Sequence, residues 1–255
     1  MDTGEYNRKF YSNIFNKRAD RYYKIQKKKI SIVLNLLEKH ENGKVLDVGC
    51  GDGLISSLIA TATGAKVYGV DISSEAVSKA RKRGIIAKVM NVDKQGFPFE
   101  KESFDAVFCG DLLEHLYDTE KLLENVRQIL KPNGYLIISV PNIASWYNRG
   151  FLLIGFMPTW IESSLKTYTG NPVIKEGVGH IHAFTKRSLT ELLRLKGFSI
   201  EKVTGSPILA DGSRSKWKES LWNGADSAFA KKDSLASTLI VKASKAEKRN
   251  KKGRV

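Results

Sequence analysis

The residues best suited to chemistry are Asp111, Glu114 and His115, two carboxylates and an imidazole close together in the chain. If this segment is helical, spacings of three and four residues place the three side chains on one face. A histidine from elsewhere, His180 or His182, would complete a cluster of carboxylates and imidazoles. Three roles fit: His115 as a general base, because its ordinary pKa of about 6.5 lies near working pH; a divalent-cation site; or a structural role that fixes the loop.

A glycine-rich turn is the second candidate site. The short apolar run Lys44–Val48 ends at Gly49, and Gly51 and Gly53 follow at alternate positions. This pattern predicts a buried parallel strand that turns into a helix from about Leu54. Glycines permit the tight turn and let the backbone approach a ligand that a Cβ would exclude. The N-terminus of the following helix would point its unpaired N–H groups at that ligand.

The residues around this turn discriminate between two ligand classes. A dinucleotide fingerprint needs a small residue where this chain has Leu54. Asp47 and Asp52 are unfavourable beside a pyrophosphate dianion, but they suit a ligand with ammonium and sulfonium charges, such as S-adenosylmethionine. Asp71, at the end of the second predicted strand, suits the ribose hydroxyls of either ligand. Asp93, at the end of the third, is placed to accept from an adenine amino group, with an ordinary turn aspartate as the alternative.

The elements that must position these residues alternate regularly. Strands are predicted over 44–48, 66–70, 85–90, 104–109 and 135–140, and helices from 54, over 74–83 and over 119–130. Such alternation predicts an α/β fold with a doubly wound, parallel sheet whose ligands lie over the carboxyl ends of the strands. A further helix is predicted over 185–196, and strands over 198–203 and 237–241 form a closing pair at one edge.

The rest of the chain divides into attachments to this domain. Residues 1–40 are predicted to form an N-terminal helical cap in two pieces that ends at Asn42-Gly43, residues 41–243 the main domain, and residues 244–255 a basic disordered tail. Residues 143–180 lack a clean period and are predicted to form an inserted lid of short helices. In this lid, Trp146, Tyr147 and Arg149 are candidate contacts for the reaction's second substrate, although the aromatic side chains could equally be core.

Composition limits the possible partners and compartment. The 255 residues carry a net charge of +15, of which the first thirty residues and the last fourteen each contribute +6. The body is therefore close to neutral, which argues against a nucleic-acid groove. The basic ends indicate either solvated tails or peripheral contact with an anionic membrane surface. Cys50 and Cys109 are expected to be reduced, and no secretory signal is visible, so we expect a cytoplasmic protein.

The motifs and their order carry a family resemblance. They are VLDVGCGDG at 45–53, GVDIS at 69–73, FDAVF at 104–108, DLLEHL at 111–116, LKPNG at 130–134, SVPN at 139–142, HAF at 182–184 and GF at 197–198. Together they closely resemble class I S-adenosylmethionine-dependent methyltransferases, in the subgroup that contains ubiquinone-biosynthesis O-methyltransferases and glycan- or lipid-pathway relatives. The resemblance covers about residues 40–243. It implies a Rossmann-like sheet of seven strands with an antiparallel last strand. It also implies cofactor contacts from Asp47, Gly49, Cys50, Gly51, Asp71, Ile72, Asp93 and Asp111.

The resemblance also implies a reaction. We expect methyl transfer from S-adenosylmethionine to an oxygen of a small lipid-like, phenolic or saccharide acceptor. The alternatives are a metal-assisted RNA ribose 2′-O-methyltransferase and a non-catalytic cofactor-binding subunit. Small-RNA 2′-O-methyltransferases hold Mg²⁺ with Glu-x-x-Glu-His and a distant histidine. By that similarity Asp111, Glu114, His115 and His182 are candidate ligands for Mg²⁺ or another divalent ion, with Asp111 in place of the first glutamate.

Overall fold

The computed structural model describes residues 19–164, 169–173, 179–210 and 215–246, with side chains from residue 25 onward. Its strands are β1 (Lys44–Val48), β2 (Lys66–Asp71), β3 (Ile86–Val89), β4 (Phe104–Gly110), β5 (Leu130–Pro141), β6 (Phe198–Ser206) and β7 (Thr238–Lys245). Its helices are α2 (Ala19–Leu36), α3 (Leu54–Thr63), α4 (Ser74–Lys82), α5 (Thr119–Ile129), α6 (Trp146–Leu153), α7 (Lys186–Leu195) and α8 (Lys216–Phe229), with short 3₁₀ turns η1 (Leu113–His115) and η2 (Asp233–Leu235).

The strands form one sheet in the order β3-β2-β1-β4-β5-β7-β6. The pairs among β1 to β5 are parallel, while β7 runs antiparallel to both β5 and β6. This topology confirms the predicted doubly wound, seven-stranded fold. Strand order reverses between β1 and β4, so the carboxyl ends of these two strands flank the position where such sheets bind ligands.

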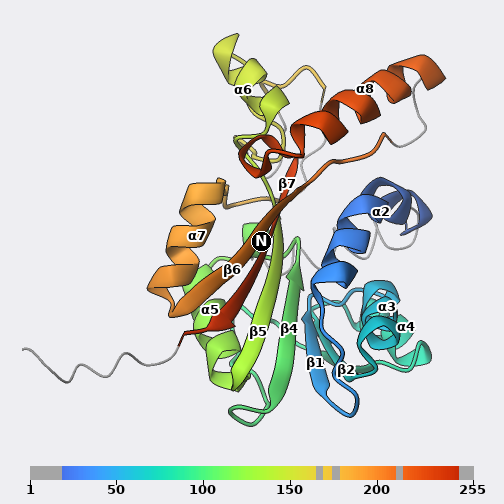
Figure 1. Cartoon of the computed structure of the whole chain (residues 1–255), viewed down its shortest axis with the longest axis vertical. Helices are drawn as coiled ribbons and strands as arrows, with labels where there is room; N and C mark the ends of the chain where they lie inside the picture. Colours follow the sequence, from blue (N-terminus) through green and yellow to red (C-terminus); the bar gives the residue numbers. More distant parts are fainter. Residues whose placement is uncertain (1–18, 165–168, 174–178, 211–214, 247–255) are drawn as a thin grey trace, which may run out of the picture.

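Helices cover both faces of the sheet (Figure 1), and each face has its own buried apolar layer. One layer joins α5 and α7 to the sheet and the other joins α2, α3 and α4. In α5 the stripe Leu122, Leu123, Val126 and Ile129 is buried because these residues recur at helical spacing. Helix α4 begins at a capping residue, since Ser73 Oγ accepts from Ala76 N at 3.2 Å.

Several predicted boundaries were wrong. Helix α2 ends at Leu36 and not at Asn42-Gly43, where a turn at positive φ instead leads into β1. Strand β5 begins at Leu130, inside the segment predicted as the helix terminus, because Leu130 pairs with Phe104. Strand β7 continues to Lys245, two residues into the predicted disordered tail. The first piece of the N-terminal cap and residues 247–255 lie outside the described residues, so the basic ends stay untested.

The lid differs most from its prediction. Within the described part of 143–180, α6 is the only helix. A second inserted helix, α8, was missed, and both project beyond the carboxyl edge of the sheet (Figure 1). The two insertions pack together, since the ring of Trp146 stacks on that of Phe229 at 4.8 Å and its Nε1–H donates to Asp226 at 2.8 Å. In α8 the fully buried residue is Asp226, so no apolar stripe marks this helix. Across the described residues, each helix is too short or too polar to span a bilayer.

Candidate active site

The glycine turn lies at the carboxyl end of β1, as predicted. Gly49, Gly51 and Gly53 have φ of 79°, 53° and 79°, which side-chain-bearing residues rarely adopt. The amides of Gly49 and Cys50 donate to the Val70 carbonyl at 2.8 and 3.1 Å, which joins the turn to β2. The Cys50 side chain is buried, so this residue presents only its backbone to the turn. The exposed backbone of Gly49 is therefore available to a ligand, as a methyl-donor loop requires.

Asp71 is the acidic residue at the end of β2. Its two carboxylate oxygens accept from Gly51 N at 2.9 Å and Ser73 N at 2.8 Å. Burial raises the pKa of Asp71, and the amide hydrogen bonds oppose that rise. A carboxylate offers about four lone-pair positions, so the half-buried Asp71 retains capacity for the two hydroxyls of a ribose. Ile72 follows it and is also half-buried, at the same edge.

Asp47 lies beneath the glycine turn and not at its surface. Its side chain is 2% exposed, and Oδ2 accepts from Ser56 Oγ at 2.6 Å. Burial raises the pKa of Asp47 to about 7, partly offset by the hydrogen bond from Ser56 and increased by the charge of Asp71. Asp47 therefore links β1 to α3, and its predicted direct contact with the cofactor stays a prediction.

This buried carboxyl predicts a specific pH dependence of stability. The pKa of Asp47 is about 7 in the folded protein, against 3.8 without burial, so between these values the folded state binds more protons. The free energy of unfolding should therefore fall as pH rises from about 4 to about 7, by up to about 1.4 kcal/mol per pH unit from this group. Asp47→Asn should remove that contribution. Urea unfolding at half-unit pH intervals measures it, and parallel curves for the two proteins would refute it.

Asp93 contacts the protein through its carboxylate. Oδ1 accepts from the amides of Tyr117 at 2.9 Å and Asp118 at 3.3 Å, ordering the loop before α5. These bonds match the alternative of a turn aspartate. Because Oδ1 alone makes these bonds, a contact between Oδ2 and adenine stays a prediction.

Asp111 does not share a face with Glu114 and His115. Only residues 113–115 form a helical turn, and Asp111 lies before it with φ of +49°. Its Oδ1 accepts from Ser139 Oγ at 2.9 Å, and its Oδ2 forms an ion pair with Lys29 of α2. The predicted one-faced set was therefore wrong, because the segment is too short a helix to bring the three together.

Lys29 was missed, although a signal for it exists. It belongs to the run Lys27-Lys28-Lys29, yet it lies four residues after Ile25 and four before Val33, on the buried stripe of α2. Its exposed fraction is 2%. Helix α2 thus contributes a buried ammonium group to the carboxyl edge of the sheet.

The structure instead groups Glu114 and His115 with His180. One potential ligand atom from each lies within 4.8 Å of the others, and all three residues are buried. The Glu114 carbonyl accepts from the amides of Ile181 and His182, which holds the distant segment against η1. His180 Nε2 lies 3.9 Å from Glu114 Oε1. His182, our predicted ligand, lies outside this group, with Nε2 3.4 Å from the Tyr117 carbonyl, and its role as a ligand stays a prediction.

Protonation of this cluster follows from its surroundings. His115 Nδ1 is 3.1 Å from the Gly179 carbonyl, and His180 Nδ1 is 2.8 Å from the Trp160 carbonyl. Because carbonyls only accept, both Nδ1 atoms carry hydrogen and both Nε2 atoms are acceptors in the neutral rings. Burial lowers the pKa of His115 to about 3, helped by His180, and burial also lowers that of His180. Both imidazoles are therefore neutral at physiological pH.

Glu114 is the group in this cluster that lacks a partner for its side chain. Neither carboxyl oxygen has a hydrogen bond from any described residue, and the exposed fraction is 1%. Burial and the charge of Asp111 raise the pKa of Glu114 well above its ordinary value. An unsatisfied buried carboxyl is costly. Two neutral imidazoles, each oriented by a carbonyl, and one carboxyl form a donor set that fits a divalent cation.

Two of the three lid residues predicted to contact the acceptor, Trp146 and Arg149, instead make contacts with other residues of this protein. Trp146 packs in the α6–α8 interface, and Arg149 donates to the carbonyls of Ala144 and Ser234 at 2.8 and 3.3 Å. Tyr147 is closer to the cluster, because its hydroxyl accepts from Trp160 Nε1 at 3.2 Å and Trp160 lies beside His180. Contact of these residues with an acceptor stays a prediction.

The glycine turn, the acidic end of β2 and the buried cluster at the end of β4 lie where the resemblance to S-adenosylmethionine-dependent methyltransferases places them. A family model described as a methyltransferase domain matches residues 18–203, and the chain belongs to this family. It is 34% identical over 128 residues to a ubiquinone biosynthesis O-methyltransferase of Pasteurella multocida, a stretch covering 43% of this chain and 52% of that one. The chain thus spans about half the length of such curated relatives.

Two further comparisons extend over most of the chain. A ubiquinone biosynthesis O-methyltransferase of Rickettsia canadensis is 25% identical over 200 residues, covering 74% of this chain and 78% of the relative. The crystal structure of an S-adenosylmethionine-dependent methyltransferase from Thermotoga maritima superposes with a TM-score of 0.62 at 19% identity. That match covers 92% of this chain and 98% of the other, and it supports the fold.

Proposed function

We propose that this methyltransferase acts on an oxygen atom of a small lipid-like, phenolic or saccharide acceptor. The observation that carries the proposal is the buried cluster of Glu114, His115 and His180 at the end of β4. The cluster adjoins the glycine turn. Leu112, which immediately precedes η1, packs against Gly49 so closely that its Cδ1 would lie 3.3 Å from a Cβ at that position. The names of the sequence relatives, ubiquinone biosynthesis O-methyltransferases, support oxygen as the methylated atom.

The chemistry is an in-line displacement. The acceptor oxygen forms a bond to the methyl carbon while the carbon–sulfur bond breaks, and the sulfur keeps the electron pair in S-adenosylhomocysteine. The protein aligns the two substrates and receives the hydroxyl proton. The pKa of His115, lowered by burial to about 3, makes this imidazole a weak base, which leaves Glu114 as the candidate proton acceptor of the cluster.

We further propose that the cluster holds a divalent cation. Glu114 would supply a carboxylate oxygen, and His115 and His180 an imidazole nitrogen each. When bound, such an ion supplies a Lewis acid that lowers the pKa of an acceptor hydroxyl. Two nitrogen donors suit Zn²⁺ or Mn²⁺ better than Mg²⁺, which prefers oxygen ligands. This proposed site differs from the one expected from the sequence, because it includes His180 and omits Asp111, which forms an ion pair with Lys29.

Methyl-transfer assays test the proposed acceptor class. We expect label from methyl-tritiated S-adenosylmethionine in catechols, polyprenyl phenols or glycans that carry a free hydroxyl, and none in the matching O-methylated compounds. Label transferred only to amine acceptors, or only to RNA, would overturn the proposal. A wild type that binds S-adenosylhomocysteine but labels no acceptor would support the alternative of a non-catalytic subunit.

Chelation tests the cation separately. Dialysis against EDTA should lower methyl transfer at least tenfold, and Zn²⁺ or Mn²⁺ should restore it better than Mg²⁺. Metal content by mass spectrometry should fall in His180→Asn and not in His182→Asn. Full activity in chelator would exclude an essential ion and leave Glu114 as the base.

A further inference from the structure

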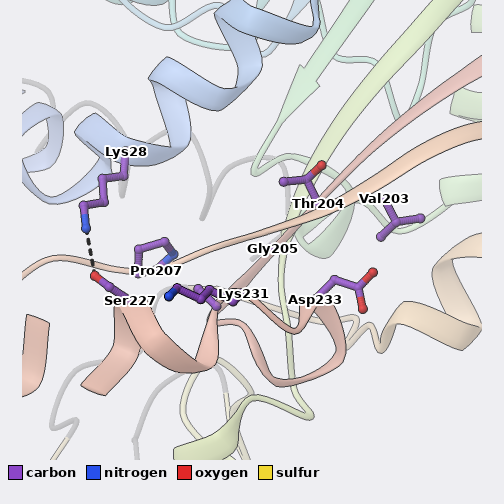
Figure 2. A pocket seen from close by; sticks show the side chains of 9 residues that line it. Lys28, Val203, Thr204, Gly205, Pro207, Ser227, Lys231 and Asp233 are labelled. Atoms are coloured by element: carbon purple, nitrogen blue, oxygen red, sulfur yellow. Dashed lines mark hydrogen bonds between the residues drawn. The ribbon is translucent and has the colours of Figure 1, made fainter. Parts of the chain in front are cut away.

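A cavity of about 340 Å³ lies away from the cluster, between α2, the end of β6 and the C-terminal end of α8 (Figure 2). Its lining includes two lysines, Lys28 and Lys231, and two hydroxyl-bearing residues, Thr204 and Ser227. The remaining lining is apolar or backbone, apart from Asp233. Two segments distant in sequence, α2 and the turn after α8, therefore each contribute a lysine to this cavity.

The charges in this cavity do not cancel. Asp233, the sole carboxylate among the described residues of the lining, pairs with Lys186 at 2.8 Å, and Lys186 is not a lining residue. Lys28 Nζ donates to Ser227 Oγ at 2.8 Å, a neutral partner that orients the ammonium group without neutralising it (Figure 2). Lys231 has no ion-pair partner among the described residues. The described lining thus combines two lysines with two hydroxyl-bearing residues around a space larger than a water molecule needs.

We infer that this cavity binds a phosphate group. Lysine ammonium groups bind phosphate as point charges. Hydroxyls such as those of Thr204 and Ser227 supply further donors to phosphate oxygens.

The position of the cavity relates this site to methyl transfer. Ser206 and Pro141 both pair with Thr238, so the end of β6 lies at the same edge of the sheet as the end of β5. Strand β6 is three strands from β4, or roughly 14 Å at ordinary strand spacing. The inference rests on the proposed function in one respect: the phosphate belongs to an extended acceptor whose hydroxyl reaches the cluster.

Direct binding of inorganic pyrophosphate, without cofactor, tests the site. Isothermal titration should show one equivalent bound by the wild type, with malonate, a dicarboxylate, bound more weakly. Lys28→Met and Lys231→Met should each weaken pyrophosphate binding about tenfold, the usual size of one charge-assisted hydrogen bond. Reductive methylation of lysines, read by mass spectrometry, should show protection of Lys28 and Lys231 by pyrophosphate.

Lys232→Met is the matched control, because it removes the same charge from the neighbouring exposed residue outside the lining. It should bind pyrophosphate as the wild type does. No binding by the wild type, or equal weakening in Lys232→Met, would overturn the phosphate site. S-adenosylhomocysteine binding on the same samples checks folding. Failure of methyl transfer to every hydroxyl acceptor would instead count against the proposed function.

Discussion

Glu114→Gln should lower methyl transfer by roughly 10²- to 10⁴-fold, the range expected when a general base or an essential metal ligand is lost. The substitution keeps the size of a side chain that is 1% exposed, so the fold should tolerate it. Affinity for S-adenosylhomocysteine should stay within about threefold, because Glu114 lies at the end of β4 and not on the glycine turn. Single-turnover kinetics with labelled S-adenosylmethionine measure the loss.

The two histidines provide the control for this result. His180→Asn should cost roughly tenfold to a hundredfold in the same assay, as expected for a cation ligand or its orienting shell. His182→Asn should stay near wild type, because its ring is directed to the Tyr117 carbonyl and away from Glu114. Equal losses in the two variants would contradict the assignment of His180 to the cluster.

Asp71→Ala should weaken S-adenosylhomocysteine binding by roughly 10²- to 10⁴-fold. The expected loss is two charge-assisted hydrogen bonds to ribose hydroxyls, each contributing about 1.5–3 kcal/mol. Part of the effect acts through the turn, because Asp71 also accepts from the amides of Gly51 and Ser73. Asp71→Asn keeps the shape and should show an intermediate loss.

Glu75→Ala is the control for Asp71, since it removes an exposed carboxylate of α4 that forms an ion pair with Lys79 in the same helix. It should leave affinity unchanged. Thermal unfolding of all three variants separates weakened binding from a disrupted fold. Unchanged binding in Asp71→Ala would remove this residue from the donor site.

Much of the fold was predictable because local patterns agree with it. Strand β1 matches its predicted bounds, as its apolar run is buried on both faces and ends at glycines that only the turn explains. Capping chemistry likewise marks the start of α4 at Ser73. Helix α8 was not predictable in this way, because its packing depends on Asp226, a buried polar residue bonded to Trp146 and Ser237.

The candidate site was predictable in composition but not in geometry. Spacing identified Glu114 and His115, yet it could not show that η1 is a single turn that leaves Asp111 outside. The choice between His180 and His182 depends on how the segment after residue 178 docks on the Glu114 carbonyl, a contact across more than sixty residues. Long-range contacts of this kind leave no periodic signal in the sequence.

The ion pair between Lys29 and Asp111 likewise depends on tertiary packing, which the sequence pattern does not reveal. A run of three lysines predicts a solvated face, and two of the three are exposed. Only tertiary packing of α2 against the sheet edge buries the third, where Asp111 compensates its charge. Helix α2 is therefore part of the edge that carries the donor and transfer sites.

The central claim is that the glycine turn and Asp71 hold S-adenosylmethionine and not a dinucleotide. Isothermal titration of the wild-type protein with S-adenosylhomocysteine, and in parallel with NAD⁺, tests it most directly. We predict one equivalent of S-adenosylhomocysteine bound and no detectable binding of NAD⁺. Binding of NAD⁺ alone, or of neither ligand, would contradict the account.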